Sequence, residues 1–148
     1  MALKDQLNNA VKDAMRAGDD LRKTTLRMAL SAIKFAEVQK GGPLDDPDVL
    51  GILQKEIKLR HEAIEDAQKA GRLDLETAAN DEIAILQVFL PQPLTPQELE
   101  QIVRAAIAET GASSMRDMGK VMGTLTPRTR GRADGKTVSD LVKQLLQG

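Results

Sequence analysis

Apolar residues recur three and four positions apart along almost the whole chain of 148 residues, and each run stops at a glycine or a proline. This spacing places the apolar side chains on one stripe of an α-helix, and no run shows the period of two that a half-buried strand needs. Glycine ends a helix because it adopts left-handed backbone angles, and proline does so because it lacks the amide N–H. The pattern predicts an all-α protein.

Seven helices are expected between these stops. Asp19 or Asp20, Asp46 and Thr95 are candidate N-caps, and a proline follows each of the last two, where it suits the first turn of a helix. Asp134 is the first choice for the start of the last helix. In chain order, the predicted stops of the first six are Gly18, Gly41, Gly71, Pro91, Gly111 and Pro127.

The prolines between Pro91 and Pro96 form a stiff boundary after the fourth helix. We therefore expect a four-helix, bundle-like part over residues 1–91 and a three-helix domain over residues 95–148. Each helix is amphipathic and is not expected to be stable alone in water, so packing of the apolar stripes must supply the stability.

The composition excludes several kinds of chemistry. The chain has no cysteine, one histidine, no tyrosine and no tryptophan, which rules out a disulfide framework, a thiolate metal site and a cysteine nucleophile. Neither a nucleophile elbow nor a glycine-rich phosphate loop is present. We expect no catalytic residue, no metal site and no cofactor. With two phenylalanines as its only aromatic residues, the chain also has too few rings for single-strand binding by base stacking.

The amino-terminal residues are amphipathic and charged, with no apolar core of a secretory signal, and no later stretch is long and apolar enough for a membrane span. A cytosolic protein with no membrane partner is expected on these grounds.

Charge is unevenly distributed along the chain. Residues 1–110 carry 14 Lys and Arg against 19 Asp and Glu, a net charge of −5, whereas residues 111–148 carry 7 against 3, a net charge of +4. Opposite charges on the two parts fit a phosphate-contacting tail on a larger body.

Four cations of the tail, Arg128, Arg130, Arg132 and Lys136, fall in one segment that we expect to be a loop running into a helix start. Loop cations beside the free N–H groups of a helix N-terminus make a phosphate site. The alternative is that these charges only solvate a surface loop.

Four glycines punctuate the same segment. Gly119 and Gly123 lie four apart on a predicted helix, which favours close packing against a neighbouring helix, and Gly131 and Gly135 are expected to supply positive φ in tight turns.

The closing sequence GKVMGTLTPRTRGRADGKTVSDLVKQLL, together with LRKTTLRMALSAIK, KEIKLRHEAIEDAQKAGR and EIAILQVFLPQPLTPQEL, resembles the bacterial YqeY-like proteins. That family is related to the tail domain of the B subunit of the tRNA-dependent Asp/Glu amidotransferase. The resemblance covers essentially the whole chain and implies an all-α fold with a small helical C-terminal domain.

In the amidotransferase the similar tail helps to hold tRNA, while glutamine hydrolysis and amide transfer occur elsewhere. The resemblance therefore implies a tRNA-binding accessory protein that contacts the RNA backbone. The residues expected to touch RNA are Lys120, Arg128, Arg130, Arg132 and Lys136, and those expected to shape the turn are Gly131, Asp134 and Gly135.

Two other functions follow from the same resemblance. One is a helical module that docks on an amidotransferase or synthetase subunit. The other is carbon–nitrogen ligase activity with glutamine as amido donor, which is implied by family association alone, since no residue of the chain suggests that chemistry.

Overall fold

The computed structural model describes residues 2–147, which form helices and no strand, so the all-α prediction is confirmed. The described chain divides into two compact units, the first ending at Pro91 and the second starting at Gln92. The helices of the first unit are α1 (Leu3–Ala17), α2 (Asp20–Lys40), α3 (Asp46–Ala70) and α4 (Leu73–Gln87). Those of the second are α5 (Pro96–Thr110), the short 3₁₀ helix η1 (Met115–Asp117), α6 (Met118–Thr129) and α7 (Gly135–Gln147).

Glycine stops end α1, α2, α3 and α5 as predicted. Gly18, Gly41, Gly71 and Gly111 all have positive φ values between 66° and 81°, the left-handed conformation that a residue with a Cβ rarely adopts. At each of them the backbone N–H turns back onto the carbonyls of the last helical turn.

Side-chain caps begin the α-helices α2, α3 and α5. Asp19 accepts from the N–H of Arg22, and Thr95 and Glu98 form a reciprocal capping box at the start of α5. For α3 the predicted cap is displaced by one residue, because Asp45 accepts from the N–H of Asp48 at 2.9 Å. The carboxylate of Asp46 instead accepts from the backbone N–H of Leu3 at 3.0 Å, which ties α1 to the start of α3.

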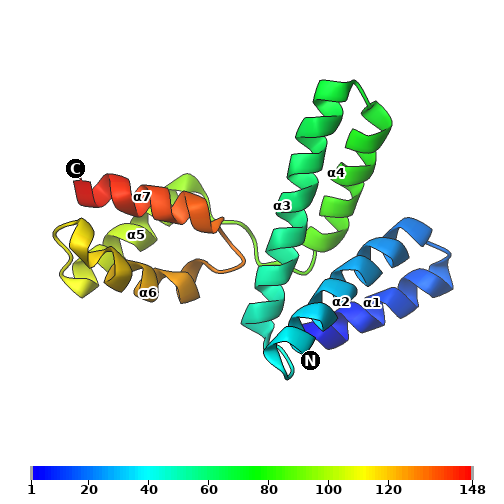
Figure 1. Ribbon diagram of the computed structural model, residues 1–148, viewed down its shortest axis with the longest axis horizontal. Coiled ribbons are helices and arrows are strands. Elements are labelled where there is room, and N and C mark those ends of the chain that lie inside the picture. Colours follow the sequence, from blue (N-terminus) through cyan, green and yellow to red (C-terminus); the bar gives the residue numbers. More distant parts are fainter. Residues whose placement is uncertain (1, 148) are drawn as a thin grey trace. The chain divides into compact units, whose positions relative to one another are not determined.

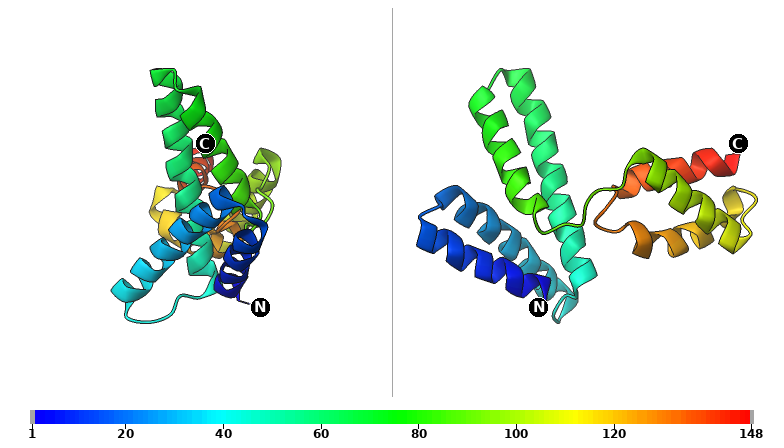
Figure 2. Two further views of the ribbon diagram at one scale, coloured as in Figure 1. Left: turned by 90° about the vertical axis from the view of Figure 1, so that its right-hand side faces the viewer. Right: turned by 180° about the vertical axis from the view of Figure 1, so that it is seen from behind.

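The first unit consists of two helical hairpins, α1 with α2 and α3 with α4, which diverge from the turn that joins α2 to α3 (Figures 1 and 2). One core holds all four helices, since α2 contacts both α3 and α4. Its fully buried large side chains include Leu7, Leu26, Ile33, Leu53 and Leu86. Burying side chains of this size stabilises the unit by roughly 1.5–3 kcal/mol each.

Arg60 is a buried cation of α3, only 7% exposed, that the sequence analysis did not identify. Its Nη1 donates to the backbone carbonyl and the carboxylate of Glu56, and its Nε lies 3.7 Å from the carboxylate of Glu82 on α4. Its Nη2 contacts the sulfur of Met28 on α2 at 3.9 Å. One side chain therefore joins α2, α3 and α4.

The second unit has a separate core between α5, α6 and α7. Val103, Val121, Leu125, Val138 and Val142 have at most 1% of their surface exposed. The buried residues of this core all belong to the second unit.

Candidate nucleic-acid interface

The four cations expected in one loop, Arg128, Arg130, Arg132 and Lys136, do not share it, which corrects the sequence interpretation. Lys120 lies in the first turn of α6 and Arg128 in its last turn, about 12 Å further along the axis at 1.5 Å per residue. Arg130 is the C-cap of α6, Arg132 lies in the following turn, and Lys136 lies in the first turn of α7.

The expected loop is shorter because α6 does not stop at Pro127 but continues to Thr129. Proline removes one N–H, whose acceptor would be the carbonyl of Gly123, four residues earlier. Both residues lie on the exposed side of α6, where water can satisfy that carbonyl. The next turn still closes normally, since the N–H of Arg130 donates to the carbonyl of Thr126 at 3.0 Å.

Arg128 forms an ion pair with Glu109 inside the second unit. Its two Nη atoms donate to the two carboxylate oxygens of Glu109 at 3.3 Å and 2.6 Å, and this ion pair joins the end of α6 to the end of α5. The hydrogen bonds to Glu109 raise the pKa of Arg128 above its usual value. Arg128 therefore stays charged while its guanidinium fork is occupied.

Arg132 links the loop to the start of the second unit. Its Nε donates to the carbonyl of Gln92 at 3.1 Å, and its own carbonyl accepts from the N–H of Leu94 at 2.9 Å. The pKa of Glu98 is lowered, first by the backbone N–H and side chain of Thr95 and to a smaller extent by the charge of Arg132. One N–H group of the Arg132 side chain is therefore already bonded to segment 92–94.

The turn between α6 and α7 depends on one of its two glycines. Gly131 is buried and has a φ of 80°, whereas Gly135 has no positive φ and simply begins α7, which corrects the expectation for Gly135. The carbonyl of Asp134 accepts from the N–H of Val138 at 3.1 Å, so Asp134 is the residue that precedes α7.

Gly119 and Gly123 face solvent, and the expectation that they permit close helix packing is wrong. A Cβ built on either residue would meet no atom within 4 Å. Lys120 is exposed on the same side of α6. Its neighbours there are Gly119 and Gly123, which have no side chains, so the helix backbone around the lysine is uncovered. Spacing alone could not reveal this, because four-residue glycine pairs occur on packed and on open faces alike.

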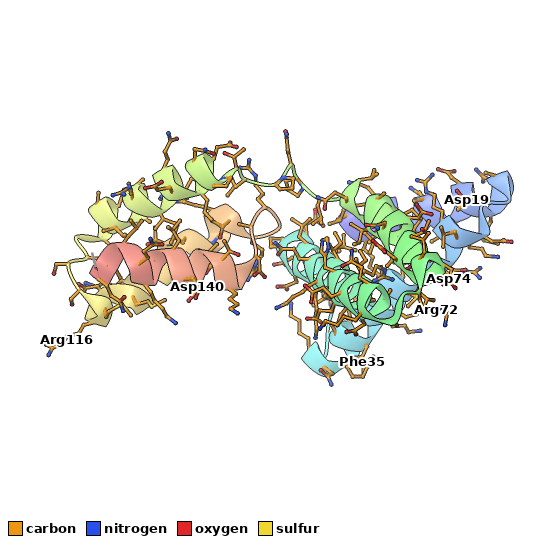
Figure 3. The ribbon with its side chains drawn as sticks, turned by 90° about the horizontal axis from the view of Figure 1, so that it is seen from above. Asp19, Phe35, Arg72, Asp74, Arg116 and Asp140 are labelled. Atoms are coloured by element: carbon orange, nitrogen blue, oxygen red, sulfur yellow. The ribbon has the colours of Figure 1, made fainter. Side chains whose placement is uncertain are left out.

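Lys120 lies close to Asp117, the acidic residue of the η1 capping box. Backbone N–H groups of Ser113 and Ser114 lower the pKa of Asp117, and the charge of Lys120 lowers it further. The neighbouring cation Arg116 projects away from the unit (Figure 3). The start of α6 is thus positive, apart from one carboxylate that the backbone already occupies.

Within residues 2–147, no three His, Cys, Asp or Glu side chains are grouped closely enough to hold a metal ion. The same residues contain no helix that is both long and apolar enough to cross a membrane.

The fold and this surface define a small all-helical protein of two compact units, the second of which carries excess positive charge. A family model described as "Yqey-like protein" matches residues 4–146, and the chain belongs to that YqeY-like family.

Individual relatives extend the comparison. The chain is 38% identical over 97 residues to Altered inheritance of mitochondria protein 41 of Vanderwaltozyma polyspora, over 64% of this chain and 52% of that protein. It is 39% identical over 80 residues to an uncharacterized protein of Schizosaccharomyces pombe, over 54% of this chain and 65% of that protein. It is 26% identical over 144 residues to the protein of Pyrenophora tritici-repentis that shares the first relative's name, over 95% and 79% of the two chains.

The chain spans less than two thirds of the length of the first two of these relatives. The cytosolic location expected from the sequence is contradicted by the comparison, because the relatives from Vanderwaltozyma polyspora and Pyrenophora tritici-repentis are named as mitochondrial proteins. The composition of a helical domain does not determine its compartment, which is why that expectation failed.

Proposed function

We propose that the C-terminal unit binds the phosphate backbone of structured RNA, with tRNA as the first RNA to test. The observation that carries the proposal is the open glycine surface around Lys120. Glycine in a helix costs about 0.5–1 kcal/mol relative to alanine, and α6 has room for a Cβ at both Gly119 and Gly123. Packing within the unit does not explain two such residues, whereas a partner that approaches the helix backbone closely does.

The start of α7 supports the same ligand. Its first turn holds Lys136 and no acidic residue, although the positive end of the helix dipole disfavours a cation there. A phosphate group placed at this end would accept from backbone N–H groups and neutralise Lys136.

Two of the other cations have partners within the second unit. Arg128 is paired with Glu109 and Arg132 is bonded to Gln92, so both contribute positive potential while they hold the unit together. Lys120 and Lys136, both exposed, are the residues we assign to direct phosphate contact.

This surface would recognise RNA by its shape and backbone charge and not by its base sequence. The described unit from Gln92 onward contains no aromatic residue, so unstacked bases have no ring on which to lie. Structured RNA is bound mainly through phosphates and 2′-hydroxyls, which lysines and helix N–H groups can contact.

A gel-shift titration with unmodified tRNA tests the proposal. The double variant Lys120→Glu and Lys136→Glu should lose at least tenfold in affinity. A charge-matched control, Lys12→Glu with Lys58→Glu on α1 and α3, should bind as the unchanged protein does. Affinity falls as salt rises, and this dependence should become shallower in the variant: the magnitude of the slope of log K against log salt should decrease by about 0.7–0.9 for each lost phosphate contact. Equal affinities of the two double variants would overturn the proposal.

Two alternatives from the resemblance give different outcomes. A subunit-docking module would be recovered with an amidotransferase or synthetase after nuclease treatment and would bind no free tRNA. Carbon–nitrogen ligase activity of the chain itself would release ammonia from glutamine in the presence of mischarged tRNA. We assign neither activity to the α6 and α7 surface, because nothing in its geometry favours them.

A further inference from the structure

The outer side of α2 carries a row of exposed apolar residues, one of which, Met28, also contacts Nη2 of Arg60 on α3 at 3.9 Å. Leu21, Met28 and Phe35 are seven residues apart, and Val38 continues the row after Phe35. The exposed fractions are 41%, 49%, 65% and 73% in chain order. Figure 3 shows Phe35 at the edge of the first unit, directed away from it.

The row has the spacing of a coiled-coil contact. Leu21, Met28 and Phe35 take the a positions of a heptad, and the d positions are Thr24, Ser31 and Val38, all of them exposed. The small side chains at two d positions leave room for a second helix to approach. The row extends for roughly 25 Å at 1.5 Å per residue, which matches a partner helix of about five turns.

Cations outnumber carboxylates beside this row. Between residues 21 and 36, α2 has four Lys and Arg and no Asp or Glu. The exposed g positions before Leu21, Met28 and Phe35 are Asp20, Arg27 and Lys34, so two of the three are cations. Nη2 of Arg27 also contacts the sulfur of Met15 on α1 at 3.6 Å. Glu37 faces another direction, where it accepts from Lys4 at 2.6 Å and from the N–H of Leu44 at 3.2 Å.

We infer that this face of α2 is a docking surface for an acidic amphipathic helix of a partner protein. A second copy of α2 would supply one flanking carboxylate, Asp20, against the two cations Arg27 and Lys34, and would leave positive charge in excess. An RNA backbone would satisfy the cations but leave Phe35 and Val38 without an apolar contact. A helix with apolar a and d residues and glutamates beside them satisfies both features.

The inference concerns the first unit only and does not depend on RNA binding by the second. The two are therefore separable by experiment, since each is tested with variants in a different unit.

The probe is a fluorescent synthetic peptide of three heptads with leucine at a and d and glutamate at e and g. Its matched partner carries lysine at e and g. In fluorescence anisotropy with the full chain, the glutamate peptide should bind and the lysine peptide should not. Phe35→Ser with Val38→Ser should weaken binding at least tenfold, whereas Val88→Ser, which removes an equally exposed apolar residue of the first unit, should leave it unchanged.

A charge reversal provides the sharper test. Arg27→Glu with Lys34→Glu should abolish binding of the glutamate peptide and create binding of the lysine peptide, with unchanged circular dichroism. Equal binding of both peptides by the unchanged protein would overturn the inference. So would a dimer in sedimentation, or adsorption to anionic phosphatidylglycerol vesicles, that Phe35→Ser with Val38→Ser abolishes, because the row would then belong to a second copy or to a lipid surface.

Discussion

Arg128 and Glu109 form a bidentate ion pair that links the last turn of α6 to the last turn of α5. Their side chains are 42% and 52% exposed, so solvent and salt reach both partners. A cation that the sequence assigned to RNA is therefore already neutralised within its own unit, although the pair can open at the surface.

Releasing Arg128 from this pair should improve RNA binding. Glu109→Gln removes a negative charge beside the proposed surface and keeps the side-chain shape, so we expect tRNA affinity to rise about two- to fivefold at low salt. Gel-shift titration measures the change. The matched control is Glu100→Gln, which releases Arg104 on the same helix. Unchanged or reduced affinity of Glu109→Gln would contradict this role for the pair.

The open glycines of α6 should separate stability from binding. Gly119→Ala and Gly123→Ala should each raise the free energy of unfolding by about 0.5–1 kcal/mol, because a Cβ fits at both positions. Urea denaturation followed by circular dichroism measures the effect. The bulkier Gly123→Leu should stay folded yet reduce tRNA affinity; a variant that loses neither stability nor affinity would show that nothing contacts this face.

Glu37 should make the stability of the first unit depend on pH. The hydrogen bond from Lys4, and next the N–H of Leu44, lower the pKa of Glu37 below its ordinary value of 4.5. A lowered folded-state pKa adds stability above the unfolded-state pKa, and that stability disappears as pH falls through the folded-state pKa. The urea midpoint of Glu37→Gln should lie below that of the unchanged protein at pH 7, and the two should converge as the pH falls through the folded-state pKa of Glu37. A difference that persists in acid would show that the ion pair is not its source.

Arg60 should be among the most sensitive positions of the first unit. Arg60→Met leaves the half-buried carboxylates of Glu56 and Glu82 without their cation, and breaking a buried pair costs about 3–5 kcal/mol. Adding Glu56→Gln and Glu82→Gln should restore part of the loss, as measured by urea unfolding. A triple variant no more stable than Arg60→Met would mean that packing, and not charge, makes this position important.

The two cores should respond separately to cavities. Leu125→Ala in the second unit and Leu53→Ala in the first should each cost about 2–5 kcal/mol, because both side chains are fully buried. Hydrogen exchange read by mass spectrometry should show faster exchange in α6 for the first variant and in α3 for the second. Faster exchange in both helices from a single variant would indicate that the units unfold together.

The sequence predicted the helix order well because glycine and proline act locally. A left-handed turn at Gly18 or Gly71 needs no distant contact, and the same is true of the capping box at Thr95. The prediction that the sixth helix stops at Pro127 was wrong, because the effect of a proline is not purely local. Whether a proline ends a helix depends on how the carbonyl four residues earlier is satisfied, which only the folded environment determines.

The candidate site was less predictable because it depends on which partners the cations find. Nothing near Arg128 in the sequence indicates Glu109, 19 residues earlier, and nothing near Arg132 indicates Gln92, 40 residues away. Arg60 did leave a local signal, since it falls between Ile57 and Ile64 on the buried stripe of α3. A lone cation on an apolar stripe indicates a buried ion pair.

Two glycines and a proline make α6 a poor helix by intrinsic propensity, and its 12 residues are too few to compensate. It is helical because Val121 and Leu125 are anchored in the core of the second unit. A peptide copied from this segment should consequently be a random coil and a poor competitor for RNA. Under the proposed function, the smallest fragment expected to bind RNA is the whole compact unit from Gln92 onward.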